Sequence, residues 1–406
     1  MTDGASESIP EPIVDQPSRA IIVSLPRELA PYARTQLRWR SGCTVQVLRD
    51  GAETYPAMLE ALAAAKETIT FETYILAADD TGNRFKDVLI ERAKAGVNVR
   101  MIYDAVGSFG LPASYGDELR AAGAEVIDFN PIAPWRRRFR LSHRDHRKVI
   151  VVDNKVAFTG GLNIANEYSG NSLLHDDAWH DMHCRVTGPI VLDLARMFRR
   201  TWLRAGGGPF PPIKPAGTAP PGEGSSYVRL IDNTLRRQRG TMRRTYLHVI
   251  RSARMSILIE NAYFLPDRGL RRALSRAVRR GVDVRVVVPG SSDVRVIEWA
   301  SLYVQRGLAK AGVKILRWRG PMMHAKTVTI DGTWSTIGSY NFDSQSRFSN
   351  LEVTVEILDP NTSQALARTF EQDIAHCDPF DEAAWNRLPL WKKAMAWLSF
   401  RFRRWL

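Results

Sequence analysis

The order of apolar and polar positions predicts alternating strands and helices in both halves of the chain. Apolar runs with a period of two indicate strands, and apolar residues recurring every three to four positions indicate helices. In the first half we expect strands at 44–48, 69–76 and 97–104 and helices at 54–67 and 83–95. In the second half we expect strands at 227–231, 256–265 and 282–289 and helices at 242–254 and 270–280. This alternation favours an α/β fold with a mixed, mostly parallel sheet flanked by helices.

The two halves also resemble each other in sequence. The junction A-G-V-N-V-R at 95–100 returns as R-G-V-D-V-R at 280–285, and the stretch at 122–126 matches that at 311–315. Between the halves, residues 206–224 hold six glycines and six prolines, a composition typical of a linker or surface loop. The predicted organisation is a disordered or extended segment at 1–40, a first repeat at 41–205, a linker at 206–225, a second repeat at 226–380 and a basic amphipathic segment at 381–406.

One motif occurs once in each half. Residues 146–163 read H-R-K-V-I-V-V-D-N-K-V-A-F-T-G-G-L-N, and residues 324–341 carry histidine, lysine, aspartate, glycine and asparagine at the same spacing. Each copy reads as a β-hairpin, in which a histidine and a lysine two residues apart point to the same face. With one hairpin per half, we expect a single site at a pseudo-twofold interface.

Composition narrows the choice of partner. The chain has 406 residues and a formal net charge of +14, which predicts an anionic partner such as nucleic acid or a membrane rich in acidic lipids. Its three cysteines are far apart and have no metal-ligand spacing, which fits a reducing compartment. We find no apolar segment of about 20 residues that would span a bilayer and no signal peptide, so we expect a cytoplasmic protein.

The residue types of the motif suit an anion better than a metal. A zinc or iron site needs three or more converging His, Cys or carboxylate ligands, and a lysine beside each histidine would repel a cation. Lys148, Lys326, Asn163 and Asn341 are instead suited to bind a phosphate. Two histidines can then divide the chemistry, one as a nucleophile and one as a general acid and base, so we expect no metal and no cofactor.

Each working imidazole needs an acceptor for its other ring nitrogen. The strands that follow the hairpins offer Asp181 in W-H-D-M-H-C-R-V and Glu352 in N-L-E-V-T-V-E. Asp153 and Asp331 lie at the hairpin turns, away from the histidines, and we interpret them as structural.

The duplicated pattern H-x-K-x4-D-x6-G-[GS]-x-N resembles the phospholipase D superfamily, from residue 44 to about residue 380. The stretches D-H-R-K-V-I-V-V-D-N-K-V-A-F-T-G-G-L-N, N-A-Y-F-L-P-D and D-S-Q-S-R-F-S-N-L-E look like bacterial cardiolipin synthases. The resemblance implies transfer of a phosphatidyl group to a histidine and then to the glycerol of phosphatidylglycerol. It also implies the catalytic residues His146, Lys148, Asp153, His324, Lys326 and Asp331, with His146 as nucleophile and His324 as acid and base. Many such synthases begin with two membrane-spanning helices, and their absence here points to a shorter class.

Two stretches suit a membrane surface. Residues 134–147 are strongly basic, carry Trp135 and Phe139, and adjoin the first histidine. Residues 390–406 contain no acid, five basic residues and three tryptophans, Trp391, Trp397 and Trp405. On a helix, most of the large apolar residues of this stretch share one face, which suits an interfacial helix on anionic lipid or, alternatively, a helix packed on the protein core.

The leading hypothesis is therefore a phosphatidyltransferase at the cytoplasmic face of the cell membrane. Its expected partners are anionic phospholipids, with phosphatidylglycerol and phosphatidylethanolamine as candidate substrates. A metal-independent nuclease or phosphodiesterase of the same superfamily would also explain the positive charge. The tryptophan-rich C-terminus disfavours nucleic acid as the partner, because a DNA-binding protein gains little from such a helix. A phospholipase D that passes the phosphatidyl group to water is a third possibility.

Overall fold

The computed structural model describes residues 23–131, 143–172, 178–213, 224–234, 238, 240–292 and 294–402. In these residues the first half contains, in order, β1 (Arg40–Arg49), α1 (Asp50–Ala63), β2 (Thr68–Thr73), α2 (Asp80–Lys94), β3 (Asn98–Asp104), α3 (Ala113–Ala121), β4 (Glu125–Phe129), β5 (Val149–Val152), β6 (Val156–Gly160), β7 (Met182–Thr187) and α4 (Ile190–Ala205).

The second half contains β8 (Ser226–Asp232), α5 (Thr241–Ser252), β9 (Ser256–Asn261), α6 (Arg268–Arg279), β10 (Asp283–Pro289), α7 (Arg295–Ala309), β11 (Lys314–Trp318), β12 (Lys326–Ile330), β13 (Trp334–Gly338), α8 (Ser344–Phe348), β14 (Val353–Leu358), α9 (Pro360–Ile374), β15 (Cys377–Pro379), α10 (Glu382–Arg387) and α11 (Leu390–Arg401). The element order confirms the α/β class and the two repeats that the sequence predicts.

The strands form one sheet of 15 strands in the order β15-β11-β10-β9-β12-β13-β14-β8-β1-β7-β6-β5-β2-β3-β4. The expectation of mostly parallel pairing is wrong. Parallel pairing is confined to β2-β3-β4 and β9-β10-β11, the strands that are joined by helices. The two strands of each motif hairpin pair antiparallel because a short turn connects them. The strand after each hairpin, β7 or β14, also pairs antiparallel, although a longer segment leads to it.

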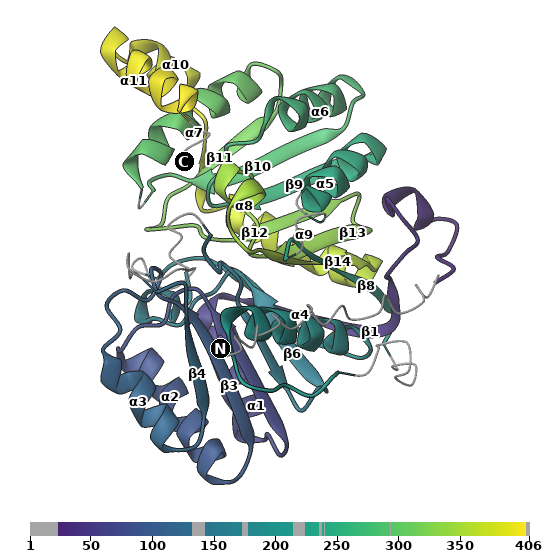
Figure 1. Cartoon of the computed structure of the whole chain (residues 1–406). Coiled ribbons are helices and arrows are strands. Elements are labelled where there is room, and N and C mark those ends of the chain that lie inside the picture. The colour runs from purple at the N-terminus through teal and green to yellow at the C-terminus, as the bar shows by residue number, and fades with distance from the viewer. Residues whose placement is uncertain are drawn as a thin grey trace, which may run out of the picture.

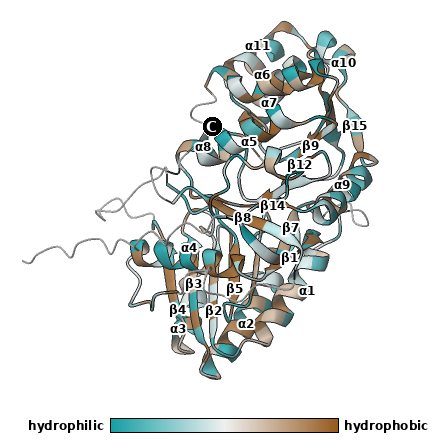
Figure 2. Cartoon of the chain, turned by 90° about the vertical axis from the view of Figure 1, so that its right-hand side faces the viewer, coloured by the Kyte–Doolittle hydropathy of each residue, from teal (hydrophilic) through white to brown (hydrophobic). Residues whose placement is uncertain are grey.

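The two halves lie one above the other, with the N-terminal half below and the C-terminal half above in Figure 1. Their inner sheet faces share a core in which residues of β5 and β7 meet residues of β13 and β14, and α4 and α9 complete it. The outer face of the first half packs under α1, α2 and α3, and that of the second half under α5, α6 and α7. Figure 2 shows many hydrophobic residues in the strands and a mixture of hydrophilic and hydrophobic residues in the helices. The central packing therefore joins the halves.

The segment before β1 differs from the expectation of a disordered or extended stretch at 1–40. From residue 23 onward it packs on the second half, where Leu25, Leu29 and Trp39 are buried in the core. Tyr32 donates a hydrogen bond to Asp331 at 2.9 Å. The sequence pattern missed this because three apolar residues without a period give no signal of where they will be buried.

The predicted linker lies between α4, which ends at Ala205, and β8, which begins at Ser226. Gly206 ends α4 in the left-handed conformation with φ of 90°, which glycine adopts without strain.

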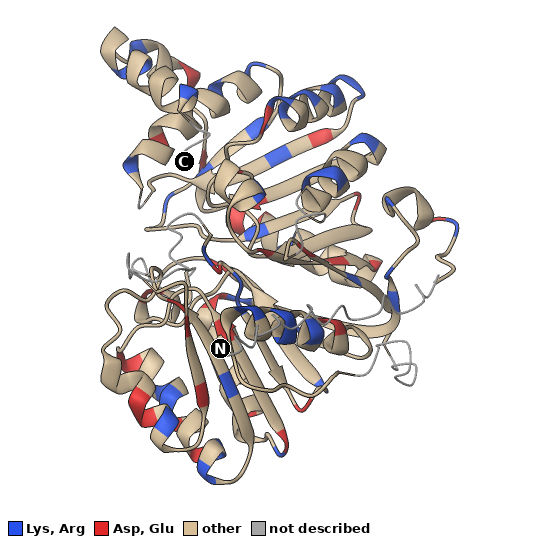
Figure 3. Cartoon of the chain, viewed as in Figure 1, with Lys and Arg blue, Asp and Glu red and all other residues tan. Residues whose placement is uncertain are grey.

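Lys and Arg concentrate on the outer helices α5 and α6 and on α4 (Figure 3). Within the described ranges, no helix is both long and apolar enough to cross a membrane.

The C-terminal helix α11 packs on α7 through one face and exposes the other. Ala396 and Ser399 are buried, and the ring of Phe400 stacks on Tyr303 at a centroid distance of 4.9 Å. The exposed large side chains on α11 and directly after it include Trp391, Met395, Trp397, Leu398 and Phe402. Three of the predicted membrane contacts, Trp135, Phe139 and Trp405, lie outside the described residues.

Candidate active site

The two motif hairpins place a histidine and a lysine side by side in each half. Lys148 directly precedes β5, and its Nζ donates to the carbonyl oxygen of His146 at 2.8 Å. Lys326 begins β12, and its Nζ donates to the carbonyl oxygen of His324. All four side chains are buried. The alternation of a strand thus brings each imidazole and ammonium to the same place, as the spacing predicts.

The backbone ties each histidine to the opposite half. The N–H of His146 donates to the carbonyl oxygen of Leu351 at 3.0 Å, and the N–H of His324 donates to that of His180 at 2.7 Å. Leu351 and His180 each directly precede one of the nominated carboxylates, Glu352 and Asp181. The two bridges are therefore equivalent under the pseudo-twofold relation.

The histidine side chains also bind residues of the opposite half. His146 Nδ1 lies 3.2 Å from Glu352 Oε2, and His324 Nδ1 lies 2.7 Å from Asp181 Oδ2. The sequence nominated both carboxylates but not the exchange, in which each histidine takes its acceptor from the other half. Because Nδ1 of each ring faces a carboxylate, Nε2 is the atom of each imidazole that can react.

The second position of the G-[GS] motif contacts the carboxylate in each half. A Cβ at Gly161 would lie 2.0 Å from Asp181 Oδ1, so only glycine fits there. The equivalent residue in the second half is Ser339, which instead donates its hydroxyl to Glu352 Oε2 and accepts a hydrogen bond from Val353 N–H at 3.1 Å. The G-[GS] pattern is visible in the sequence, but its fit to a carboxylate appears only in the structure.

Replacing Gly161 with alanine is expected to reduce turnover by about 100-fold or more, because the methyl group must push Asp181 away from His324. Initial rates of the purified variant measure this effect. Gly110 is the matched control, since a Cβ there meets nothing within 4 Å, and Gly110→Ala should keep wild-type rates. A fully active Gly161→Ala variant would show that the position of Asp181 is unimportant.

Burial and mutual repulsion lower the positive charge that the site holds when empty. Burial, followed by the charge of Lys326, lowers the pKa of Lys148 to about 7. Burial and the Lys148 ammonium also lower the pKa of His146, so this imidazole is neutral at physiological pH. Burial raises the pKa of Asp181 to about 6. Two buried ammoniums that repel each other favour a bound anion.

This electrostatic arrangement predicts how anion binding depends on pH. A phosphodiester with one fixed negative charge raises the pKa of Lys148 when it binds, so its affinity is full below about pH 7 and falls as pH rises above it. Inhibition constants of a short-chain phosphodiester between pH 6 and about pH 9 measure the slope. Lys148→Arg is the control, because a guanidinium stays charged throughout and should flatten the profile. An unchanged slope in that variant would contradict the assignment to Lys148.

The two asparagines nominated for phosphate are placed differently. Asn163 is buried, accepts from Ile75 N–H at 3.1 Å and donates to the hydroxyl of Tyr168 at 2.7 Å. Its amide thus connects the segment after β2 with the segment between β6 and β7. Asn341 is also buried, but its Oδ1 has no hydrogen-bond partner among the described residues.

The motif aspartates lie at the turns, as the spacing predicts, and bind backbone amides. Asp153 accepts from the N–H groups of residues 66, 67 and 68 at 2.8 to 2.9 Å. Asp331 accepts in the same way from residues 254, 255 and 256. Each carboxylate fastens its hairpin to the start of β2 or β9. In the first half this also explains why α1 ends at Ala63, four residues before the predicted end.

Aromatic rings that no sequence pattern indicates surround the histidines. The ring of Tyr74 lies 4.9 Å from that of His146. Tyr168, Trp179 and Tyr263 lie between 5.5 and 6.4 Å from the ring of His324. Their positions follow from long-range packing, which gives no local pattern.

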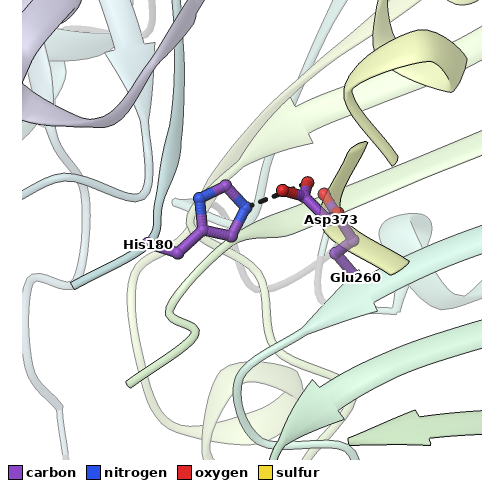
Figure 4. A group of neighbouring side chains, drawn as sticks. All are labelled: His180, Glu260 and Asp373. Atoms are coloured by element: carbon purple, nitrogen blue, oxygen red, sulfur yellow. Dashed lines mark ion pairs between the residues drawn. The ribbon is translucent and has the colours of Figure 1, made fainter. Parts of the chain in front are cut away.

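Among the described residues, the side chains whose ligand atoms lie close enough together to hold a metal ion do not include either motif histidine. His180, Glu260 and Asp373 bring ligand atoms within 4.8 Å of one another (Figure 4). All three are buried. This group belongs to a larger buried cluster of charged side chains that includes Asp50 and Arg49.

Comparison with known proteins defines the class of protein. The family model described as cardiolipin synthase, PLD-like domain, matches residues 58–202 and 246–374, which is one segment in each repeat. A phosphatidylserine synthase structure from Haemophilus influenzae Rd KW20 has a similar fold, with a TM-score of 0.64, 14% identity and coverage of 91% of this chain and 97% of that chain. The fold and the duplicated motif thus define a two-repeat phospholipase D-like protein.

Relatives identify the family more narrowly. The cardiolipin synthase of Geobacillus thermodenitrificans (strain NG80-2) is 34% identical over 386 residues, which cover 92% of this chain and 76% of that protein. Cardiolipin synthase 2 of Bacillus anthracis is 35% identical over 348 residues, covering 84% and 68%. The chain belongs to the cardiolipin synthase family of the phospholipase D superfamily. Its enzymatic class is phospholipid phosphatidyltransferase.

Proposed function

We propose that the protein transfers a phosphatidyl group from one phosphatidylglycerol to the glycerol of another, releasing free glycerol and forming cardiolipin. The observation that carries this proposal is the exchange of carboxylates between the halves. It gives each histidine an oriented Nε2 beside a buried lysine.

In the first step, Nε2 of His146 attacks the phosphorus and forms a P–N bond while the P–O bond to the leaving glycerol breaks. The lowered pKa of His146 supports this role, because a nucleophile must be unprotonated. His324 donates its Nε2 proton to the departing oxygen. Lys148 and Lys326 offset the charge on the non-bridging phosphate oxygens.

In the second step, His324 accepts the proton of a hydroxyl group on the incoming phosphatidylglycerol. The oxygen attacks phosphorus, the P–N bond breaks, and His146 returns to its neutral form. Glu352 and Asp181 accept hydrogen bonds from the Nδ1–H groups throughout and stabilise the imidazolium charge. Asn341 Oδ1, which has no hydrogen-bond partner among the described residues, would accept a hydrogen bond from the hydroxyl group of the acceptor, and the Nδ2 amide group of Asn341 would donate to the phosphate.

The protein would reach its substrate by peripheral binding to anionic lipid on the cytoplasmic face. Trp391, Met395, Leu398 and Phe402 are exposed at a spacing that puts them on one face of α11. Lys392 and Arg401 on the same helix would contact acidic headgroups.

Other exposed apolar groups lie on segments that contact the motif segments. Phe109 is 79% exposed in the loop after β3, and Asp104 at the end of β3 accepts from the N–H of Asp145 next to His146. Val294 and Val296 are exposed after β10, where Ser291 donates to the carbonyl oxygen of Pro321. Loops of both halves thus carry apolar tips beside the motif segments, where lipid would enter.

Replacing Trp391 and Leu398 together with serine is expected to reduce binding to vesicles with phosphatidylglycerol by about tenfold or more, because two large apolar groups lose their contact with lipid. Vesicle sedimentation measures the bound fraction. Met255 is the matched control, since it is 65% exposed but lies just before β9, at the strand end opposite Asn261 and the site. Equal binding by Met255→Ser and the double variant would contradict the role of α11.

Incubation of the purified protein with phosphatidylglycerol vesicles and a chelator tests the reaction. Mass spectrometry should detect cardiolipin and free glycerol in equal amounts. Formation of phosphatidic acid alone would indicate hydrolysis instead. Cleavage of DNA without lipid turnover would overturn the proposal in favour of a nuclease.

A further inference from the structure

A buried charged cluster adjoins the active site and joins the two halves. His180 lies between Asp50 at the start of α1 and Asp373 on α9, with Nδ1 2.8 Å from Asp50 Oδ1 and Nε2 3.2 Å from Asp373 Oδ2. Figure 4 shows His180 on one side of the cluster and Asp373 with Glu260 on the other. Arg49 binds Asp373 Oδ1 at 2.5 Å.

The cluster is linked directly to the residue that holds His324. Asp50 Oδ1, which faces His180 Nδ1, also accepts from the backbone N–H of Asp181 at 3.0 Å. The N–H of Asp50 in turn donates to the carbonyl oxygen of Asp181 at 2.9 Å. The backbone of His180 donates to Met322 at 2.9 Å and accepts from His324 at 2.7 Å. His180 and Asp50 therefore surround the peptide segment that positions Asp181 beside His324.

The backbone of Asp50 carries strain that this arrangement explains. Its φ of 51° lies in the left-handed region, which is sterically strained for a non-glycine residue. In this conformation Asp50 begins α1, and its carboxylate contacts His180 Nδ1 and the backbone N–H of Asp181. Ser172 donates both its N–H and its hydroxyl to Asp50 Oδ2, at 2.8 and 2.7 Å.

The charges of the cluster balance without a metal. Asp373 and Asp50 raise the pKa of His180 to about 10 against the opposing effect of burial, so its ring is charged. Burial and Asp373 raise the pKa of Glu260 to about 8, so Glu260 holds a proton at neutral pH. Arg49 and His180 then offset Asp50 and Asp373. A divalent cation at Asp373 would lie next to the Arg49 guanidinium, which disfavours it.

We propose that His180, held between Asp50 and Asp373, is a positioning residue that fixes the Asp181 carboxylate against His324 by bracing α1 of the first half on α9 of the second. The stacking of Trp318 on its ring, at a centroid distance of 5.1 Å, completes its fixed orientation. The pseudo-twofold partner of His180 is Leu351, so the brace acts on one histidine of the pair and leaves His146 without an equivalent. The kinetic test of this role rests on the proposed function, because it measures the formation of cardiolipin.

Three variants test the proposal. His180→Ala removes both ring contacts, His180→Asn can retain the hydrogen bond to Asp50, and Asp373→Asn removes the charge on the far side. Glu356→Gln is the matched control, because Glu356 is equally buried in an ion pair with Arg229 and belongs to another cluster. The readouts are kcat, KM for phosphatidylglycerol, and the proton NMR resonance of the Nδ1–H that His324 shares with Asp181, assigned by its loss in Asp181→Asn.

We expect His180→Ala to lower kcat by about 10- to 100-fold with little change in KM, and to broaden or shift the shared-proton resonance. His180→Asn should recover most of kcat and the resonance, and Asp373→Asn should fall between. Glu356→Gln should change neither. If wild-type protein makes no cardiolipin, the proposed function fails, while the resonance still decides the role of His180.

An unchanged resonance and kcat in His180→Ala and Asp373→Asn would overturn the proposal and leave the cluster a structural ion pair. The absence of any resonance that depends on Asp181 would also count against it. A stoichiometric divalent metal in the purified wild type, lost in His180→Asn, would overturn it in favour of a metal site.

Discussion

Replacing either motif histidine, as His146→Ala or His324→Ala, is expected to lower the rate of cardiolipin formation by about 10⁴-fold or more. Residues that act as one catalytic unit each carry nearly the full effect, because the reaction needs a nucleophile and a proton donor together. For the same reason the double variant should be little slower than either single variant. Cardiolipin formation from phosphatidylglycerol vesicles, measured over a long time course, gives the residual rates.

His248→Ala is the control for these variants. His248 lies on α5 and its Nε2 bonds the carbonyl oxygen of Pro31, on the outer side of the second half. Its replacement should leave the rate unchanged. If one motif histidine could be removed with a loss of less than about tenfold, the two rings would not form one site.

The carboxylates should show the exchange between halves directly. Glu352→Gln and Asp181→Asn keep the size of each side chain but no longer stabilise an imidazolium, so each is expected to lower turnover by about 10²- to 10⁴-fold. Double-mutant cycles on the rate should find strong coupling of His146 with Glu352 and of His324 with Asp181. Strong coupling within each half, and none between halves, would contradict the arrangement.

Much of the fold could be predicted from the sequence because its signals are local. The periods of apolar residues give the strands and helices of each half, and the equal spacing in residues 146–163 and 324–341 reveals the duplication. Because His146 and Lys148 are two positions apart in an extended segment, their side chains point to the same face of that segment. The turn position of Asp153 and Asp331 likewise indicates the structural role in which their carboxylates bind backbone amides.

The remaining features depend on contacts between distant segments. The sequence could nominate Asp181 and Glu352, but which histidine each one binds follows from how the halves pack face to face. The burial of Trp39 in the second half and the bracing of Asp181 by His180 and Asp50 arise in the same way. The parallel pairing was overestimated because strand–helix alternation is visible in the sequence, whereas the pairing partners of a hairpin are not.

The division of roles between the two histidines is tested most directly with a phosphatidyl ester of p-nitrophenol. This leaving group needs no proton, so loss of the general acid should spare the first step and block the second. We predict that His324→Ala releases one equivalent of nitrophenolate in a rapid burst and accumulates a phosphatidyl group on His146, identified by mass spectrometry, while His146→Ala gives no burst. A burst from His146→Ala, or none from either variant, would contradict the account.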